Sequence, residues 1–391
     1  MKATTMDRTA FARRRQQLAM EPMRKDAFVR SRQQTRAAAE TLVLDRATTF
    51  SFVRETDGIE IYENASARRV KAMMHVDGGG GIAPFVDAFA SQAGSSHTFR
   101  LAMFRYFRAA FSDGMHLHSH STTGHHDLSL NWMAMTHQDT TYDVIFASAT
   151  TVYQRDPRAG LIAMSRGDAK AAAVGVHVWD SVALRDLPPS THMDRLTVTA
   201  SGFVVEAIDE STIVVSFVLQ INEPTSLEWQ RRLAQAAVAS FRTGLVVLVP
   251  PRLWTQHVFC YLCFKTFGAF ARRHHCRLCG HAICSKCTSY VATQSLGVVQ
   301  SDDPLAAIKA SLPFCVPCGR GVDAPPQEKM RPSMAHEERK HSIRSTYVSS
   351  DAFSWRDDQD IVLHNSGMPR ISQSRHTSNK SSRSSRRSSQ S

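Results

Sequence analysis

Residues 260–287 read CYLCFKTFGAFARRHHCRLCGHAICSKC and hold six of the eight cysteines of the 391-residue chain. Cys315 and Cys318 complete the set, so four Cys-x2-Cys pairs lie between residues 260 and 318. Two thiolates separated by two residues lie on a tight turn and can bind one metal ion together, and two such turns complete a tetrahedron around zinc. The spacing therefore predicts two structural Zn²⁺ sites, each closed by four sulfurs and without an open position for a catalytic water.

The rest of the composition indicates a soluble protein with more than one domain. Hydrophobic residues make up 42% of the chain and charged residues 21%, and no apolar run approaches the roughly 20 residues of a membrane span. The first residues, MKATTMDRTAFARRRQQ, lack the apolar centre of a secretory signal. We therefore expect a cytoplasmic protein, in which clustered cysteines bind metal and do not form disulfides.

The net charge of +12 is concentrated at the two ends of the chain. Residues 1–36 carry ten Lys/Arg against three acidic residues, and residues 366–391 carry six Lys/Arg against none. We interpret residues 1–40 as a basic arm, partly helical or disordered, and residues 322–391 as a disordered linker and Arg/Ser-rich tail. Because the basic charge lies in the tails and in the small cysteine-rich segment, nucleic acid is not an expected partner.

Residues 41–252 have the pattern of an α+β domain. Strands are expected at 49–53, 58–62, 127–136, 142–153, 160–165, 174–183, 195–207 and 211–221. Helices are expected at 84–90, at 99–111 and from Ser226 to about Val247, with Thr225 and Glu228 forming a capping box. The His-rich residues 116–126 are interpreted as a polar loop. An antiparallel sheet must bury its apolar face, and the long C-terminal helix is the expected cover.

This order of elements resembles the START family, whose helix-grip fold holds a lipid or sterol. The resemblance implies an antiparallel sheet, a long C-terminal helix and a cavity with a possible lipid ligand. A filled core that acts as a scaffold is the alternative, and the sequence leaves both open.

Residues 272–277, RRHHCR, resemble the signature of FYVE zinc fingers and lie within that family's eight-cysteine spacing. The resemblance implies a small cross-brace finger at 254–321 that binds phosphatidylinositol 3-phosphate on endosomal membranes. It also implies one zinc on Cys260, Cys263, Cys284 and Cys287, and the other on Cys276, Cys279, Cys315 and Cys318. RING and PHD fingers are cross-braced too, but they use a histidine ligand, whereas eight sulfurs already complete both sites here.

The residues of this segment point to the same chemistry. Guanidinium groups match a phosphate monoester bidentately, and histidine can donate to it as well. We therefore expect a lipid phosphate to be contacted by Arg272, Arg273, His274, His275 and Arg277. On the neighbouring apolar loop, Phe267 and Phe270 are expected to enter the membrane.

Two positions depart from the family's pattern. His257 stands where the family has the aspartate of its Trp-x-x-Asp element, which begins here at Trp254. Pro313 stands where the family has an arginine two residues before the seventh cysteine. Both family residues contact the headgroup, so the sequence leaves open which phosphoinositide binds.

No catalytic constellation is evident: the glycines at 78–81 lack the Lys-Ser/Thr of a P-loop, there is no G-x-S-x-G, and every cysteine is a predicted metal ligand. The whole-chain order resembles the START/FYVE adaptor proteins that are numerous in oomycetes. We therefore predict a non-enzymatic, zinc-dependent adaptor, peripheral on endosomal membranes. Two alternatives stay open, a lipid-transfer protein that the finger addresses to a membrane, and a protein-interaction scaffold with a structural finger. The oligomeric state, protein partners and pathway have no signal in the sequence.

Overall fold

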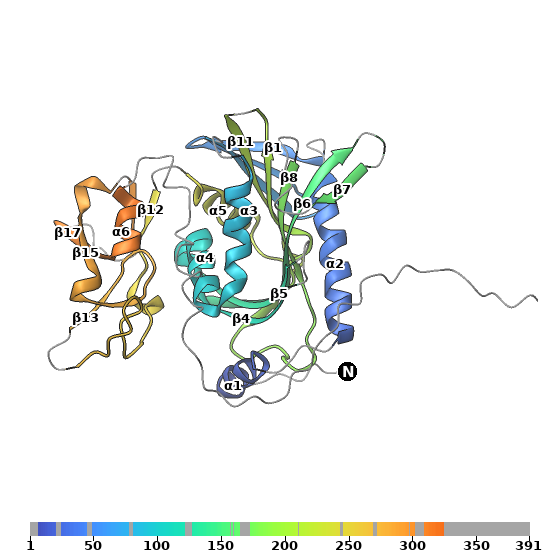
Figure 1. Ribbon diagram of the computed structural model, residues 1–391. Helices are drawn as coiled ribbons and strands as arrows, with labels where there is room; N and C mark the ends of the chain where they lie inside the picture. Colours follow the sequence, from blue (N-terminus) through green and yellow to red (C-terminus); the bar gives the residue numbers. More distant parts are fainter. Residues whose placement is uncertain are drawn as a thin grey trace, which may run out of the picture. The chain divides into compact units, whose positions relative to one another are not determined.

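The computed structural model describes residues 7–20, 25–44, 49–77, 81–121, 127–156, 158, 160–164, 173–209, 211–242, 245–268, 272–296, 298–301 and 309–323 (Figure 1). The chain divides into two compact units, residues 1–337 and 338–391. The second unit lies outside the described residues, as does nearly all of the tail that we predicted to be disordered. Among the described helices, none is long and apolar enough to cross a bilayer.

A large, almost wholly antiparallel sheet dominates the N-terminal two thirds of the chain. Its strands are β1 (Ser51–Thr56), β2 (Ile59–Asn64), β3 (Arg69–Asp77), β4 (Phe111–Ser121), β5 (Asp127–His137), β6 (Thr140–Asp156), β7 (Gly160–Met164), β8 (Ala173–Ser181), β9 (Asp194–Leu196), β10 (Ser201–Ala207) and β11 (Thr212–Gln220). They pair in the order β1-β2-β3-β11-β10-β8-β6-β5-β4, with β7 and β9 added to β6. The predicted α+β class with an antiparallel sheet is confirmed. We call residues 25–253 the sheet domain.

Helices cover both faces of this sheet. The helix α2 (Lys25–Leu44) lies on one face, and α3 (Ala83–Ser91), α4 (Ser96–Phe107) and α5 (Leu227–Ala239) lie on the other (Figure 1). Both faces need a cover because both carry apolar side chains, as in strand β8, whose side chains alternate between the two faces of the sheet. Val176 and Val178 pack in the core under α2, whereas Trp179 packs in the core under the other three helices.

The N-terminal arm is helical over most of its described length. Helix α1 (Arg8–Leu18) is capped by Asp7 and buries Phe11 and Leu18 beside β4 and β5. Arg15 lies over the ring of Trp132, at 3.6 Å from its centroid. Helix α2 crosses the boundary that we predicted at residue 40.

Aromatic side chains occupy the space between the sheet and the helices α3 to α5. The ring of Phe203 lies 4.6 Å from Phe217, 4.8 Å from Tyr106 and 5.1 Å from Phe89, between centroids. Trp179 lies 5.4 Å from Phe217. Two internal cavities next to this cluster measure about 10 Å³ each, which is room for about one water molecule. The cluster therefore packs as a filled core.

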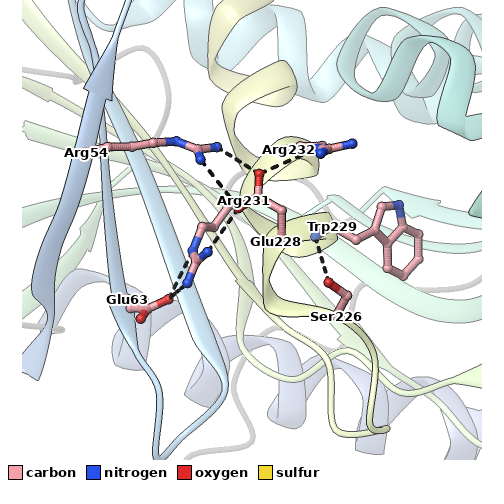
Figure 2. A network of polar contacts seen from close by, with 7 residues as sticks. All are labelled: Arg54, Glu63, Ser226, Glu228, Trp229, Arg231 and Arg232. Atoms are coloured by element: carbon pink, nitrogen blue, oxygen red, sulfur yellow. Dashed lines mark hydrogen bonds and ion pairs between the residues drawn. The ribbon is translucent and has the colours of Figure 1, made fainter.

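Ion pairs fasten the start of α5 to the edge of the sheet (Figure 2). Glu228 accepts from Arg54 of β1 and from Arg231, and Arg231 also pairs with Glu63 of β2. The N-cap is Ser226, whose hydroxyl accepts from the backbone N–H of Trp229 at 3.4 Å. Our prediction of Thr225 as the N-cap was therefore wrong by one residue.

Several predicted elements were wrong in detail. Helix α5 ends at Ala239 and not near Val247, because the Val-rich residues that follow favour a strand, β12 (Leu245–Val247), which pairs with β16 (Val298–Gln300). The single strand expected at 195–207 is broken into β9 and β10, with Ala200 between them at φ 39°. Strand β3 was missed. The helix expected at 99–111 ends at Phe107 as α4, and residues 116–121 of the predicted His-rich loop belong to strand β4, which pairs with β5, whereas residues 122–126 lie outside the described residues.

The cysteine-rich segment is built from short pieces. Strand β13 (Arg273–His275) pairs with β14 (Ala282–Cys284), and β15 (Thr288–Ala292) pairs with β17 (Ser311–Cys315). Helix α6 (Val316–Asp323) follows directly. We call residues 254–323 the finger.

The filled aromatic core makes a prediction about stability. Phe203→Ala deletes a fully buried ring and should lower the free energy of unfolding by about 3–5 kcal/mol. Phe52→Ala, at a ring that is 59% exposed, should lower it by less than about 1 kcal/mol. Urea unfolding followed by tryptophan fluorescence measures both, and equal effects of the two variants would contradict a filled core.

Candidate functional site

Two tight turns with the same backbone hydrogen bonds present the first four cysteines. In the first, the N–H of Phe264 donates to the carbonyl of Cys260 at 2.8 Å, and in the second, the N–H of Gly280 donates to the carbonyl of Cys276 at 2.8 Å. Phe264 and Gly280 close the turns with φ of 57° and 71°. Glycine adopts this left-handed conformation without steric cost, whereas phenylalanine does not. Each turn brings its two sulfurs to one side.

The structure brings the eight cysteines into the two groups that the family resemblance implied. The sulfurs of Cys260, Cys263, Cys284 and Cys287 lie within 4.8 Å of one another, as do those of Cys276, Cys279, Cys315 and Cys318. Tetrahedral Zn–S bonds of about 2.3 Å require sulfurs about 3.8 Å apart. The distances Cys263 Sγ–Cys284 Sγ and Cys279 Sγ–Cys315 Sγ are 3.7 and 3.9 Å. Both quartets therefore fit a structural zinc ion, and the finger holds two.

Two accessible arginines lie at the start of strand β13, which begins three residues before the ligand Cys276. Arg272 and Arg273 are both exposed. The Arg273 guanidinium donates to the side-chain oxygen of Gln256 at 3.3 Å, and it lies 5.8 Å from the ring centroid of Phe267. Because both arginines are exposed, both guanidinium groups can reach a ligand in solution or on a membrane.

The two histidines of this strand have different surroundings. His274 Nε2 lies 3.3 Å from the hydroxyl of Ser285. His275 is half-buried and donates from Nε2 to the backbone carbonyl of Thr255 at 3.0 Å. Burial lowers the pKa of His275, and the positive charges of Arg273, Arg277 and His274 lower it further. The fold of the finger thus fixes the position of the His275 ring through its hydrogen bond to Thr255.

Trp254 organises this end of the strand, and our sequence analysis gave it no role. Its ring stacks on His275 with centroids 4.6 Å apart and planes at 16°. The guanidinium of Arg277 lies 4.3 Å from the Trp254 ring centroid, and the indole N–H donates to the carbonyl of Val249 at 3.0 Å. A cation over an indole face is favourable. Trp254 thus fixes the positions of two of the five predicted headgroup residues.

Of the two predicted membrane-entering residues, the structure describes one. Phe267 is half-buried and packs against the finger core around Ile283 and Phe314. Phe270 lies outside the described residues, within 269–271. The preceding residues form a hairpin in which Phe259 bridges to Thr266 and the N–H of Phe267 donates to the carbonyl of Val258 at 2.8 Å. The turn with Phe264 closes one end of this hairpin, and residues 269–271 follow its other end.

The segment that leads into the finger is also part of the finger's structure. The N–H of Val249 donates to the carbonyl of Arg277 at 2.7 Å, next to the ligand Cys276. Strand β12 pairs in parallel with β16, which lies in the 27 residues between the sixth and seventh cysteines. A Cβ at Gly280 would come within 3.2 Å of the Leu253 carbonyl. The segment between Cys287 and Cys315 therefore supplies a strand, β16, that pairs with β12 in the residues leading into the finger.

Comparison with known families agrees with this geometry. Residues 254–324 match the family model "FYVE zinc finger", so this part of the chain is a FYVE zinc finger. Matching curated proteins include the 1-phosphatidylinositol 3-phosphate 5-kinase FAB1 of Saccharomyces cerevisiae, at 47% identity over 38 residues, which is 10% of this chain and 2% of FAB1. Human Rabankyrin-5 is 38% identical over 53 residues, 14% of this chain and 4% of that protein. Protein FREE1 of Arabidopsis thaliana is 62% identical over 29 residues, 7% and 5% of the two chains. The chain thus spans only a small part of these relatives' lengths.

Solved structures that resemble the chain are START domains. Human STARD10 matches with a TM-score of 0.34 and 10% identity, over 53% of this chain and 79% of that one. Human StAR-related lipid transfer protein 5 matches with a TM-score of 0.36 and 10% identity, over 55% of this chain and 98% of that one.

The two quartets predict a defined metal content. The purified protein should contain two zinc ions per chain, and Cys276→Ser should reduce this to about one, because a tetrahedral site with three sulfurs binds zinc far more weakly. The control Ser285→Ala changes a hydroxyl beside the ligand Cys284 and should keep both ions. Metal analysis by mass spectrometry tests this, and a wild-type content well below two would contradict the assignment.

Proposed function

We propose that the protein is a non-enzymatic membrane-targeting adaptor whose finger binds the phosphate of a phosphoinositide. The observation that carries the proposal is the pair of exposed guanidinium groups, Arg272 and Arg273, on a strand that runs directly into the zinc ligand Cys276. A guanidinium that is held in place loses less conformational entropy when it binds a phosphate than a free one does. His274, at the edge of the same strand, is a further donor.

The expected affinity of one finger is modest. Burying one phenylalanine contributes about 1.5–3 kcal/mol, and each basic residue near an anionic leaflet about 1 kcal/mol. The sum for Phe270 and the basic residues of 272–277 is about 5–7 kcal/mol of binding free energy, which corresponds to a dissociation constant in the micromolar range or weaker. Stable residence on a membrane therefore requires a second contact, such as a protein partner, a second copy or a basic tail.

The membrane that we propose is endosomal. The proposal is supported by the match of the finger to a segment of FAB1, a protein whose name refers to phosphatidylinositol 3-phosphate. The match does not extend beyond the finger, so no kinase activity is proposed.

For the sheet domain, we propose the role of a scaffold. The rings of Phe203, Phe217 and Trp179 fill the space in which a helix-grip fold would carry a lipid. The lipid-transfer alternative requires that these rings move apart, and it predicts a lipid that copurifies with the protein.

Removal of the two exposed arginines should abolish targeting. Arg272→Ala/Arg273→Ala is expected to weaken binding to vesicles with phosphatidylinositol 3-phosphate by at least about 30-fold, since each arginine contributes about 1 kcal/mol or more. The control Arg32→Ala/Arg36→Ala removes the same charge from the exposed side of α2 and should leave binding intact. Vesicle flotation measures both, and equal losses would show that only net charge matters.

The insertion loop can be tested with a matched pair of phenylalanines. Phe270→Ser should weaken vesicle binding about tenfold or more, because the apolar side chain no longer enters the lipid. Phe52→Ser changes an equally large side chain, 59% exposed, on strand β1 of the sheet domain, and should have no effect on flotation. Unchanged binding by the Phe270 variant, or equal losses in the two variants, would contradict the proposal.

A further inference from the structure

The finger is unusual in that it offers a headgroup almost only positive charges and hydrogen-bond donors. Residues 254–301 contain four histidines, four arginines and lysines before Cys279, and no aspartate or glutamate. Asp302 and Asp303 are the only acidic residues in 254–321, and they lie outside the described residues.

The neutral acceptors around the strand are already engaged. The side-chain oxygen of Gln256 accepts from Arg273 at 3.3 Å, the carbonyl of Thr255 accepts from His275 at 3.0 Å, and the Ser285 hydroxyl lies 3.3 Å from His274. His257 is exposed and stacks on Phe259, with ring centroids 5.2 Å apart. None of these groups is a carboxylate that could accept from a sugar hydroxyl.

The two halves of a phosphoinositide headgroup need opposite partners. A phosphate monoester needs donors, and it gains most from charged ones. The hydroxyls of an inositol ring are distinguished from one another chiefly by acceptors placed opposite them, and a carboxylate is the strongest of these. A site discriminates strongly between related ligands only when it makes specific hydrogen bonds to the group that differs.

We infer that the finger recognises the phosphate monoester of a membrane lipid and does not read the inositol ring that carries it. Its ligands are then the phosphatidylinositol monophosphates irrespective of the position of the phosphate, together with phosphatidic acid, which has a monoester and no ring. This inference rests on the proposed function, because it concerns the same arginine strand. It specifies the chemical group that the finger binds, a phosphate monoester, and it extends the expected ligands to the membrane lipids that carry this group.

The test uses the full chain with zinc bound and vesicles of equal surface charge. The vesicles contain one of the 3-, 4- or 5-monophosphates of phosphatidylinositol, or phosphatidic acid, with phosphatidylserine added to equalise the charge. Vesicles with unphosphorylated phosphatidylinositol are the control that lacks a monoester. We expect apparent affinities for the four monoester lipids within about threefold of one another, and at least about tenfold weaker binding to the control, in line with the loss of charge-assisted bonds.

Each other outcome has a distinct meaning. More than about tenfold preference for a single monophosphate would overturn the inference and leave the proposed function standing. Absence of binding to every monoester lipid would end the proposed function itself. Equal binding to the control vesicles would also overturn the inference, because no monoester would then be needed.

Two further arms complete the experiment. Glycerol phosphate, a soluble monoester, should not displace the protein from phosphatidic acid vesicles when its concentration equals that of the accessible lipid, because it offers no membrane contact, and full displacement at that concentration would assign the site to free phosphates instead of lipids. Asp302→Asn/Asp303→Asn should leave the ranking of the lipids unchanged. A changed ranking would mean that these acids supply the missing acceptor, and it would contradict the inference.

Discussion

Coordination of metal by sulfur is the constraint on which the functional part of this molecule depends. The finger has only about 70 residues, and its core consists of a few side chains such as Ile283, Leu312 and Phe314. A core of this size does not stabilise a fold without additional crosslinks, such as metal sites. The two cysteine quartets supply these crosslinks. Because the cysteines of the two quartets alternate in pairs along the sequence, each zinc ion connects turns that lie far apart in the chain. The arginine strand is rigid because it runs into one of those turns.

Next to the two zinc sites, aromatic and charged side chains have different roles. Trp254 holds His275 and Arg277 from one side, and its indole N–H is anchored on Val249 in the linker. Arg272 and Arg273 stay exposed at the start of strand β13. The result is a surface with half-buried donors beside exposed ones, and without a carboxylate within 254–301. Such a surface attracts anions through its charge and selects among them through the geometry of its donors.

The sequence predicted the zinc sites of the finger, and it predicted the class and most strands of the sheet domain, but not the bounds of every element. Metal-ligand spacing is short-range information, since four Cys-x2-Cys pairs specify their turns locally, whereas the grouping into two interleaved quartets was implied by the family resemblance, and the structure has it. The role of Trp254 was not predicted, because it depends on a stacking contact across 21 residues. Strand β16, which lies in the 27 residues before Cys315, pairs with β12, and no local sequence pattern predicts this contact. In the sheet domain, β3 was missed although every second side chain along Arg69–Asp77 is buried, which is the alternation of a strand. Strand β4 was missed because its histidines and serines resemble a polar loop, and its pairing with β5 decides its structure.

The central claim is that metal holds the headgroup strand in its binding conformation. The most direct measurement strips the metal with a chelator and then follows vesicle flotation of the full chain while zinc is returned in known equivalents. The account predicts that the stripped protein stays unbound and that flotation recovers as zinc rises to two per chain. Full binding by the metal-free protein would contradict this claim, because the arginines would then bind the lipid without the zinc sites that position them.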